Sequence, residues 1–379
     1  MASVTKRDRA AGPRYTAMYR DGSGRQRSAG TFTSRREADK AGRQAENKLE
    51  QGTWVDPVSG KTTFASYVEK VWWPSRQLEA STKAGYRSYL DRHFLPFFGH
   101  LPMADILPST VQAWVTQAVA SGLSPRSVVK YHVMLHGVFK RAVRDRVIAF
   151  NPCSDTELPK VVKKKRRIVT PAEFELLLAH MHGRYRLMLL TEIETGLRWG
   201  ELVALRPRHV DQLRCAVTIE ETVVEVSRKI SPTGDRMIIK PYPKDDEPRT
   251  LTVSPELLDL IAERITALNL DRDDLLFPST DSKAGRPLSR NTFRTRVWLP
   301  ALKQSGLDFG VRMHDLRHAH ASWLLAGGAD LKAVMERLGH SQIQTTQQYL
   351  HTLPEADRQA FAAFQSIRVG KHPSPRQAQ

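Results

Sequence analysis

A strongly basic segment divides this 379-residue chain into parts that must fold separately. Between Pro159 and Arg167 there are six Lys and Arg residues and no acidic residue. Like charges at this density repel one another and resist burial in a hydrophobic core, so the segment is expected to stay extended. We therefore predict a linker over 159–168, with independently folded domains on either side of it.

The charge of the whole chain points to a polyanionic partner. The formal net charge is +18, and nucleic acid is the commonest polyanion that so basic a protein meets. A merely solvated basic surface remains the alternative. If DNA is the partner, the linker cations are expected to lie along its backbone. These linker cations are Lys163, Lys164, Lys165, Arg166 and Arg167.

The composition also bears on the compartment. The chain has no run of eighteen apolar residues, so no membrane span is expected. The N-terminus has no apolar segment behind its charges, which argues against a secretory signal. Cys153 and Cys215 are too few for a disulfide framework or a cysteine-rich metal site. A cytoplasmic protein is therefore expected, associated with the nucleoid when it binds DNA.

The first 58 residues predict a small β-hairpin and helix. Residues 14–20 and 27–32 have strand composition, and 21–24 is a turn. A helix is predicted from Ser34 to Gln51. The module is too small to hold an enzyme active site and is basic enough to bind DNA. Its predicted DNA contacts are Arg14, Arg20, Arg25 and Arg27.

Residues 59–158 predict a four-helix domain. Apolar residues recur at helical spacing in four stretches. Their members include Phe64, Tyr67, Val68 and Val71; Tyr86, Tyr89 and Leu90; Val111, Trp114, Val115 and Val119; and Val128, Leu135, Val138 and Phe139. The fourth helix begins after Ser124, an N-cap, with Pro125 in its first turn. Basic residues on the other faces are predicted to contact DNA: Lys83, Arg87, Arg126 and Lys130.

The third domain, 159–379, is predicted to be mixed, so that the fold class is α+β and mostly helical. Three short strands, at 217–226, 237–239 and 250–253, are expected to form a small antiparallel sheet. The remainder reads as helices, and the tail 371–379 as disordered. The predicted helices are 170–182, 184–195, 254–268, 289–304 and one from 314 onward.

Residue types suited to phosphoryl transfer occur in four segments of this domain. Arg198 lies at a predicted helix–helix turn, and His314 and Arg317 stand three apart on one predicted helix. His340 follows a predicted helix C-cap, and Tyr349 lies nine residues further on. The sequence therefore offers two arginines, two histidines and a tyrosine for one site.

This combination meets the demands of breaking a phosphodiester bond without a metal. A tyrosine with a pKa of about 10 is only about one part in a thousand ionised at neutral pH, so it needs a base or a positive field. Guanidinium groups match phosphate oxygens, and a general acid must protonate the departing sugar hydroxyl. We predict a DNA strand-breaking and rejoining enzyme with Tyr349 as its nucleophile, requiring no cofactor and no ATP.

Taken together, the motifs resemble those of the tyrosine recombinases, the phage integrase family. The resemblance is specific over 170–355, looser over 62–152, and only general over 1–58, which is similar to the arm-binding domains of longer integrases. It is carried by the stretches Thr195 to Leu205, His314-Asp315-Leu316-Arg317-His318, Leu338-Gly339-His340 and Tyr349-Leu350-His351.

The resemblance implies a role for each matched residue. Arg198 and Arg317 would clamp the scissile phosphate, and His340 would donate a further hydrogen bond. His314 would assist proton handling, and Tyr349 would form a 3′-phosphotyrosyl bond. The catalytic lysine is best matched by Lys244, although its acidic neighbours depart from the expected pattern; Lys240 is the second candidate.

The resemblance also implies partners and a biological role. It implies double-stranded core and arm attachment sites, a homotetramer on synapsed DNA, and a host DNA-bending protein and a directionality factor as accessory partners. The basic module at 1–58 favours integration and excision of a phage or other mobile element over chromosome-dimer resolution.

Two other interpretations of the motifs stay open at this point. Residues 330–350 also fit a helix-turn-helix, in which case the chain would be a non-catalytic DNA-binding regulator. His314 and His318 superficially resemble a zinc-protease motif, but Asp315 replaces its glutamate and no third ligand is placed.

Overall fold

In the computed structural model the chain forms two compact units, Met1–Lys163 and Lys164–Gln379, and the division falls inside the predicted basic linker. Residues 159–162 belong to no helix or strand. The structure describes residues 2–8, 12–22, 24–51, 54–55, 59–162, 167–231, 233–241, 248–280, 285–340, 342–347 and 365.

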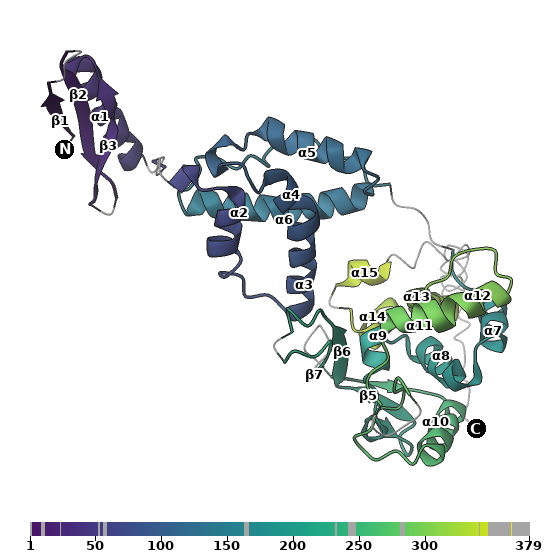
Figure 1. Cartoon of the computed structure of the whole chain (residues 1–379). Coiled ribbons are helices and arrows are strands. Elements are labelled where there is room, and N and C mark those ends of the chain that lie inside the picture. Colours follow the sequence, from purple (N-terminus) through teal and green to yellow (C-terminus); the bar gives the residue numbers. More distant parts are fainter. Residues whose placement is uncertain are drawn as a thin grey trace. The chain divides into compact units, whose positions relative to one another are not determined.

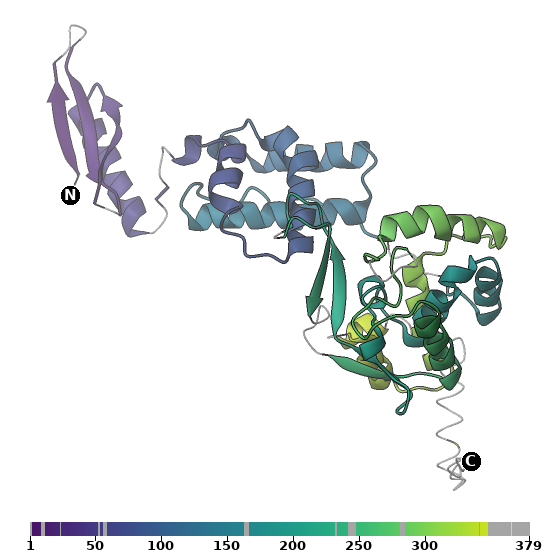
Figure 2. The same ribbon diagram turned by 60° about the horizontal axis from the view of Figure 1, so that its bottom comes forward.

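The N-terminal module is a three-stranded antiparallel sheet with one helix packed against it (Figures 1 and 2). Its elements are β1 (Ser3–Arg7), β2 (Arg14–Arg20), β3 (Gln26–Phe32) and α1 (Arg35–Glu50). The predicted hairpin and helix are present, but the prediction omitted β1, which pairs with β2. β1 lies at the sheet edge and is almost wholly exposed, so it lacks the apolar alternation by which strands are recognised.

The helical part of the first unit contains the four predicted helices. They comprise α2 (Phe64–Tyr67) continued by η2 (Val68–Trp72); α3 (Ala80–Tyr89) continued by η3 (Leu90–Phe94) and α4 (Leu95–Phe98); α5 (Pro108–Ala120); and α6 (Pro125–Arg144). Short 3₁₀ turns, η1 (Ser59–Lys61) and η4 (Met103–Asp105), precede the first and third helices. The predicted cap is present, because the Ser124 side chain accepts a hydrogen bond from the Ser127 amide at 3.2 Å.

Aromatic side chains fill the core of this helical part. The ring of Phe64 lies 5.6 Å from that of Phe98 and 5.7 Å from that of Phe139. Most of the predicted apolar positions are buried here, but Val71 and Val119 are 41% and 43% exposed. These two predictions were wrong because each residue lies at the edge of its helix's apolar stripe, where periodicity alone cannot separate core from rim.

Helices surround the second unit's main core, and each predicted helix is found with ends shifted by a few residues. They are α7 (Pro171–Ala179), α8 (Gly183–Thr195), α9 (Trp199–Leu202), α10 (Pro255–Ala267), α11 (Arg290–Phe293) continued by η6 (Arg294–Trp298) and α12 (Leu299–Gln304), α13 (Met313–Ala326), α14 (Leu331–Leu338) and α15 (Ile343–Gln347). A 3₁₀ turn, η5 (Pro207–His209), follows α9.

The strands of this unit pair differently from the prediction. β4 (Val210–Asp211), β5 (Ala216–Ile219) and β8 (Arg249–Thr252) form a three-stranded antiparallel sheet, and β6 (Glu221–Glu225) and β7 (Met237–Pro241) form a separate two-stranded ribbon. The stretch 217–226, predicted as one strand, is therefore two strands that turn apart at Glu220. Glu220 and Glu221 interrupt the alternation of apolar and polar residues, and the two strands take different pairing partners on either side of Glu220. The fold class, mostly helical with small antiparallel sheets, is confirmed.

Within the described part of the chain, no helix combines the length and the apolar character needed to cross a bilayer.

Candidate active site

A left-handed glycine places Arg198. Helix α8 is capped by Gly196, whose φ is 65°, and Arg198 is the N-cap of α9. A Cβ atom on Gly196 would lie 2.5 Å from Cδ2 of His320 and 2.9 Å from a methyl carbon of Leu338. Both the backbone conformation and the close packing therefore require glycine here.

Arg317 is buried at the centre of the site. Its side chain is 1% exposed, and it lies on α13. Nη1 donates to the carbonyl of Gly196 and Nη2 to the carbonyl of Leu338, each at 2.6 Å. Arg317 thus joins the turn before Arg198 to the end of α14, although Gly196 and Leu338 are 142 residues apart in the sequence.

Arg198 binds the carbonyl of Gly339, the residue after the Leu338 whose carbonyl Arg317 binds. Its Nη2 donates to the oxygen of Gly339 at 2.6 Å, and its Nη1 donates to Glu201 at 3.0 Å. Leu338 and Gly339 are consecutive, so the two arginines hold successive carbonyls immediately before His340. The Arg198 side chain is 29% exposed, which makes it the more accessible of the two guanidinium groups.

Glu201 is a buried counter-ion shared by two arginines. Its side chain is 1% exposed and binds Arg249 at 2.5 Å as well as Arg198 at 3.0 Å. Burial raises the pKa of Glu201, but Arg249 and Arg198 together outweigh it and hold the pKa below its usual range. The carboxylate therefore stays ionised and holds the Arg198 guanidinium in place.

Arg249 was not singled out from the sequence, although it lies at the first position of β8. Its Nε donates to the Arg337 carbonyl at 3.2 Å, so it ties β8 to α14. Arg337 in turn donates to the backbone carbonyls of Glu194 and Thr252, each at 2.9 Å. No local pattern could have revealed these contacts, because the partners come from separate segments.

His340 follows a left-handed turn at Gly339, whose φ is 62°. The His340 amide donates to the Met335 carbonyl at 3.0 Å, which completes the end of α14. Its Nδ1 lies 2.9 Å from the hydroxyl oxygen of Thr346, a fully buried residue of α15. The glycine C-cap predicted before His340 is confirmed.

His314 lies in the first turn of α13 and is exposed, in contrast to the buried Arg317. The two residues are three apart on the same helix, but they differ in burial, and Met313 directly before His314 is itself buried. The His314 ring packs edge-to-face against that of His318, with ring centroids 4.7 Å apart.

Two buried acid–base groups near the arginines were missed by sequence reasoning. Glu192 on α8 is 1% exposed, and one of its carboxyl oxygens has no hydrogen-bond partner among the described residues. Burial raises its pKa well above the usual range against the opposing effect of Arg317. His320 donates through Nδ1 to the Ile193 carbonyl at 2.8 Å and accepts from Arg337 at Nε2. The sequence signalled the burial of Glu192 and His320 only through their position in predicted helices with apolar neighbours.

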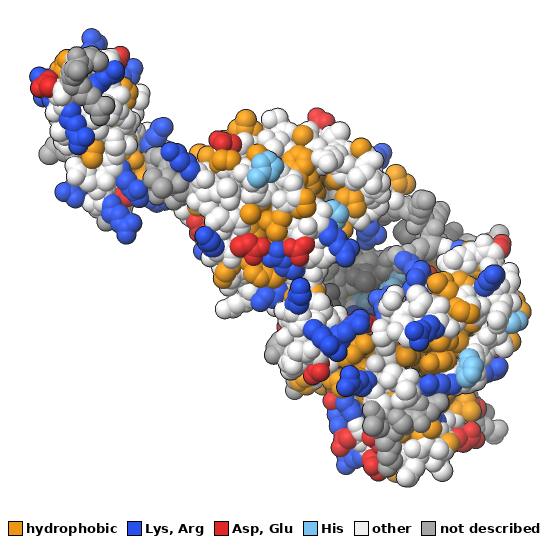
Figure 3. Space-filling model, in the orientation of Figure 1, with side chains coloured by type: hydrophobic (Ala, Val, Ile, Leu, Met, Phe, Trp, Pro, Cys, Tyr) orange, Lys and Arg blue, Asp and Glu red, His pale blue; other side chains and the backbone are white. Residues whose placement is uncertain are grey.

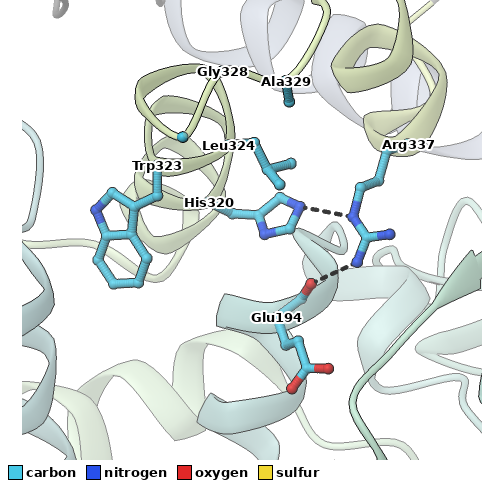
Figure 4. A pocket seen from close by; sticks show the side chains of 8 residues that line it. Glu194, His320, Trp323, Leu324, Gly328, Ala329 and Arg337 are labelled. Carbon is cyan, nitrogen blue, oxygen red and sulfur yellow. Dashed lines mark hydrogen bonds between the residues drawn. The ribbon is translucent and has the colours of Figure 1, made fainter. Parts of the chain in front are cut away.

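His320 and Arg337 also line a cavity of about 580 Å³ at the ends of α13 and α14 (Figure 4). Figure 4 shows Arg337 between the His320 ring and the backbone oxygen of Glu194, joined to both by hydrogen bonds. None of the described residues that line this cavity is a predicted catalytic residue.

The remaining predicted catalytic residues, Tyr349 and Lys244, lie outside the described residues, as do Lys163, Lys164, Lys165 and Arg166 of the linker. Helix α15 ends at Gln347, two residues before Tyr349. Lys240, the second lysine candidate, is on β7 opposite Thr222 of β6. The described structure therefore brings Arg198, Arg317 and His340 together, with His314 on the same helix as Arg317.

The predicted DNA contacts differ in how far their charges are neutralised. Arg126 and Lys130 are exposed on α6, and Lys130 lies 5.3 Å from the centre of the Tyr89 ring. Arg87, by contrast, is bound by Glu69 at 2.7 Å and by Asp91, and it also lies over Trp73. Because carboxylates neutralise Arg87, the exposed Arg126 and Lys130 of α6 are better placed than Arg87 to bind DNA phosphates.

The other predicted DNA contacts divide in the same way. Arg27 is paired with Asp21 at 2.9 Å, and Arg167 is bound by Asp308 at 2.7 Å and by Glu173, with its guanidinium over the Phe309 ring. Arg167 is therefore bound to other residues of the second unit, whereas the prediction treated it as part of the extended linker. Arg20 donates to the Gly24 carbonyl at 2.9 Å, Arg25 is exposed, Arg14 opens β2 and Lys83 lies 5.7 Å from the Trp73 ring centre. Figure 3 shows Lys and Arg side chains spread over the visible face of the N-terminal module.

Two family profiles match the sequence. The phage integrase family matches residues 167–356, and the N-terminal SAM-like domain of phage integrases matches residues 63–118. The integrase named for prophage phiRv2 of Mycobacterium tuberculosis is 28% identical over 89% of this chain and 88% of its own length. The tyrosine recombinase XerD of Pseudomonas putida is 28% identical over 79% of this chain and 94% of its own.

Solved structures of lambda integrase share the fold. A dimer bound to a COC′ core site superposes with a TM-score of 0.58 at 21% identity, covering 91% of this chain and 93% of the other. A tetramer bound to a Holliday junction gives 0.55 at 22% identity, covering 89% and 95%. With the family profile spanning the domain that holds Arg198, Arg317 and His340, the chain belongs to the phage integrase family and is a tyrosine-type site-specific DNA recombinase.

Proposed function

We propose that this recombinase cleaves and rejoins DNA through Tyr349 and that it integrates and excises a phage or other mobile element. The observation that supports the catalytic assignment is the arginine pair. Arg317 and Arg198 bind the successive carbonyls of Leu338 and Gly339, which draws three distant segments together directly before His340. Chain continuity then limits how far Tyr349 can lie from this cluster.

The reaction replaces one phosphate ester bond, to the 5′ oxygen of DNA, by another, to the Tyr349 oxygen. The Tyr349 hydroxyl gives up its proton, for which His314 is the candidate acceptor, and its oxygen attacks the phosphorus. The bond from phosphorus to the 5′ oxygen breaks, and a 3′-phosphotyrosyl bond forms. The departing 5′ oxygen takes a proton from a general acid, for which Lys244 is the candidate and Lys240 the second choice. Attack by a 5′ hydroxyl of another strand reverses the step, so the ester bond is conserved and no ATP is required.

The described side chains would stabilise the charge that grows on the phosphate. Arg198 offers the accessible guanidinium, and His340 would donate a further hydrogen bond. Arg317 is buried, so direct contact between its guanidinium and the phosphate requires the residues that cover it to move when DNA binds. Exposed His314, at the start of α13, would handle protons near the nucleophile.

Three domains would divide the work. Residues 1–58 would bind arm-type sites, residues 59–158 core-type sites, and residues 159–379 would carry out catalysis. The lambda integrase structures hold a dimer on a core site and a tetramer on a Holliday junction, which supports a homotetramer on synapsed DNA for this chain as well. A host DNA-bending protein and a directionality factor are proposed as accessory partners.

Recovery of a covalent adduct tests the nucleophile. The protein is purified from cells that carry its gene in its native setting, denatured, and the attached DNA sequenced, with Tyr349→Phe treated alongside. Wild type should carry DNA joined through Tyr349 at one recurring junction, and the phenylalanine variant should carry none. Equal recovery from both proteins would reject Tyr349, and the absence of adducts even on a nicked DNA that prevents rejoining would reject the proposed chemistry.

Footprinting on the same locus tests the biological role. An integrase should protect the junction and also a second, separate set of sites. The dimer-resolution alternative, favoured by the likeness to XerD, predicts protection of the junction alone.

A further inference from the structure

Thr346 contacts a catalytic candidate from the segment that leads to the nucleophile. Its hydroxyl oxygen lies 2.9 Å from Nδ1 of His340, and its side chain is fully buried. It belongs to α15, three residues before Tyr349. A buried hydroxyl is costly to place unless its hydrogen bond is made, so this contact constrains both partners.

The backbone on the other side of His340 is held independently. The His340 amide binds the Met335 carbonyl at 3.0 Å, and the preceding carbonyl, of Gly339, accepts from Arg198 at 2.6 Å. With the main chain fixed in this way, the rotation and protonation of the imidazole depend on what its ring nitrogens contact. Among the described residues, Thr346 contacts Nδ1.

A neutral imidazole carries one proton, on either Nδ1 or Nε2, and a group that donates a hydrogen bond to Nδ1 requires the proton to be on Nε2. A histidine that donates from Nε2 while neutral has a lone pair on Nδ1, which must accept a hydrogen bond. The Thr346 hydroxyl can donate that bond. With the hydroxyl as donor, the neutral ring carries its proton on Nε2, the nitrogen on the opposite side of the ring.

We propose that Thr346 is a positioning residue that holds His340 as an Nε2–H donor toward the scissile phosphate. The proposal rests on the function assigned above, because it requires His340 to act on the phosphate. It extends that function by adding a buried residue that would act through His340.

Matched substitutions separate the hydroxyl from the shape of the side chain. Thr346→Val keeps the volume and removes the hydroxyl, Thr346→Ser keeps the hydroxyl, and Gln344→Ala alters an exposed position of the same helix. The rate of covalent adduct formation is measured on a nicked duplex carrying the recovered junction. We expect the valine variant to be about 10- to 100-fold slower, since a misdirected catalytic group typically costs up to about 100-fold. The serine and Gln344 variants should stay within about threefold of wild type.

The pH dependence gives a readout that a packing defect would not move. An imidazolium carries protons on both nitrogens, so acidification toward pH 6 restores the Nε2 donor without help from Thr346. The deficit of Thr346→Val should therefore shrink between pH 8 and pH 6. The folded fraction of each variant is measured at both pH values, because the stability of the second unit is itself expected to fall on acidification.

A double-substitution cycle tests whether Thr346 acts through His340. In a His340→Ala background, adding Thr346→Val should cause no further loss. An additive loss, a deficit that is constant with pH, or a valine variant as fast as wild type would each overturn the proposal. Failure of the underlying function looks different, because wild type itself would then form no adduct that depends on Tyr349.

Discussion

The Nη2 atom of Arg198 lies 2.6 Å from the carbonyl oxygen of Gly339, the residue directly before His340. This contact joins the start of α9 to the end of α14, and Arg317 binds the preceding carbonyl, of Leu338, in the same manner. The arginines thus have a structural task as well as the proposed catalytic one. The two tasks can be separated by experiment, because the two side chains differ in burial.

Lysine substitutions should distinguish the two arginines. Lysine keeps the charge but cannot reproduce the two-pronged contacts, so Arg198→Lys and Arg317→Lys should each slow adduct formation by about 100-fold or more. Arg317→Lys should also lower the free energy of unfolding by about 3 kcal/mol, since two charge-assisted hydrogen bonds in the interior are lost. Urea denaturation measures this difference, with exposed Arg296→Lys as the control; equal stability of the Arg198 and Arg317 variants would contradict the structural role of Arg317.

Removing the charge of Glu201 should destabilise the second unit. Glu201→Gln leaves Arg249 and Arg198 without their shared buried counter-ion, and breaking a buried ion pair costs about 3 to 5 kcal/mol. Thermal unfolding should show a lower midpoint, and adduct formation should fall because Arg198 loses its support. Glu175→Gln, at an exposed position on α7, provides the control, and a Glu201 variant with unchanged stability would show that the ion pairs contribute nothing net.

A methyl group at position 196 should be poorly tolerated. Gly196→Ala forces a left-handed alanine and brings its Cβ to 2.5 Å from the His320 ring, so we expect a loss of about 3 kcal/mol in unfolding free energy. Gly122→Ala has a similar backbone, with φ at 87°, but open space around the new Cβ, and should cost only about 1 kcal/mol. Comparing the two by urea denaturation separates steric conflict from backbone strain; equal losses would mean that the His320 contact relaxes freely.

The stability of the second unit should fall on mild acidification. Burial lowers the pKa of His320 to about 4, with Arg337 acting in the same direction, against 6.5 in the unfolded chain. The folded state binds fewer protons than the unfolded state in this range, so stability is lost as pH falls from about 6.5 toward 4, by about 3 kcal/mol for this group.

The check on His320 is the difference in unfolding free energy between pH 7 and pH 4.5. His320→Gln, which can still accept from Arg337 but does not titrate, should reduce that difference. His182→Gln, at the exposed N-cap of α8, is the matched control. A slope identical in wild type and His320→Gln would show that other groups control acid unfolding.

The exposed cations of α6 should contribute to DNA affinity more than the paired Arg87. Each phosphate contact that is removed should lower the slope of log affinity against log salt by about one. Lys130→Ala and Arg126→Ala should each show this change, whereas Arg87→Ala should alter the slope little because Glu69 and Asp91 already neutralise its charge. Binding titrations at several salt concentrations provide the test, and a larger change for Arg87 would reverse our assignment.

Local pattern was sufficient for much of the architecture. The apolar spacing and the Ser124 cap predicted α6, and the glycines at 196 and 339 predicted the turns that present Arg198 and His340. These features depend on contacts between residues close in sequence, such as caps, left-handed turns and helical stripes, so they can be read without knowledge of the rest of the chain.

Pairing between distant segments was beyond the reach of local pattern. Nothing near residue 249 reveals that Arg249 will share Glu201 with Arg198, and nothing near residue 317 reveals that its guanidinium will be buried on two carbonyls. The break between β5 and β6 is of the same kind, since each strand chooses a different partner. Short-range chemistry thus determined the elements and the identities of the candidate catalytic residues, whereas burial, ion pairing and strand partnership were decided by packing of the whole unit, because they depend on which desolvated groups meet in space.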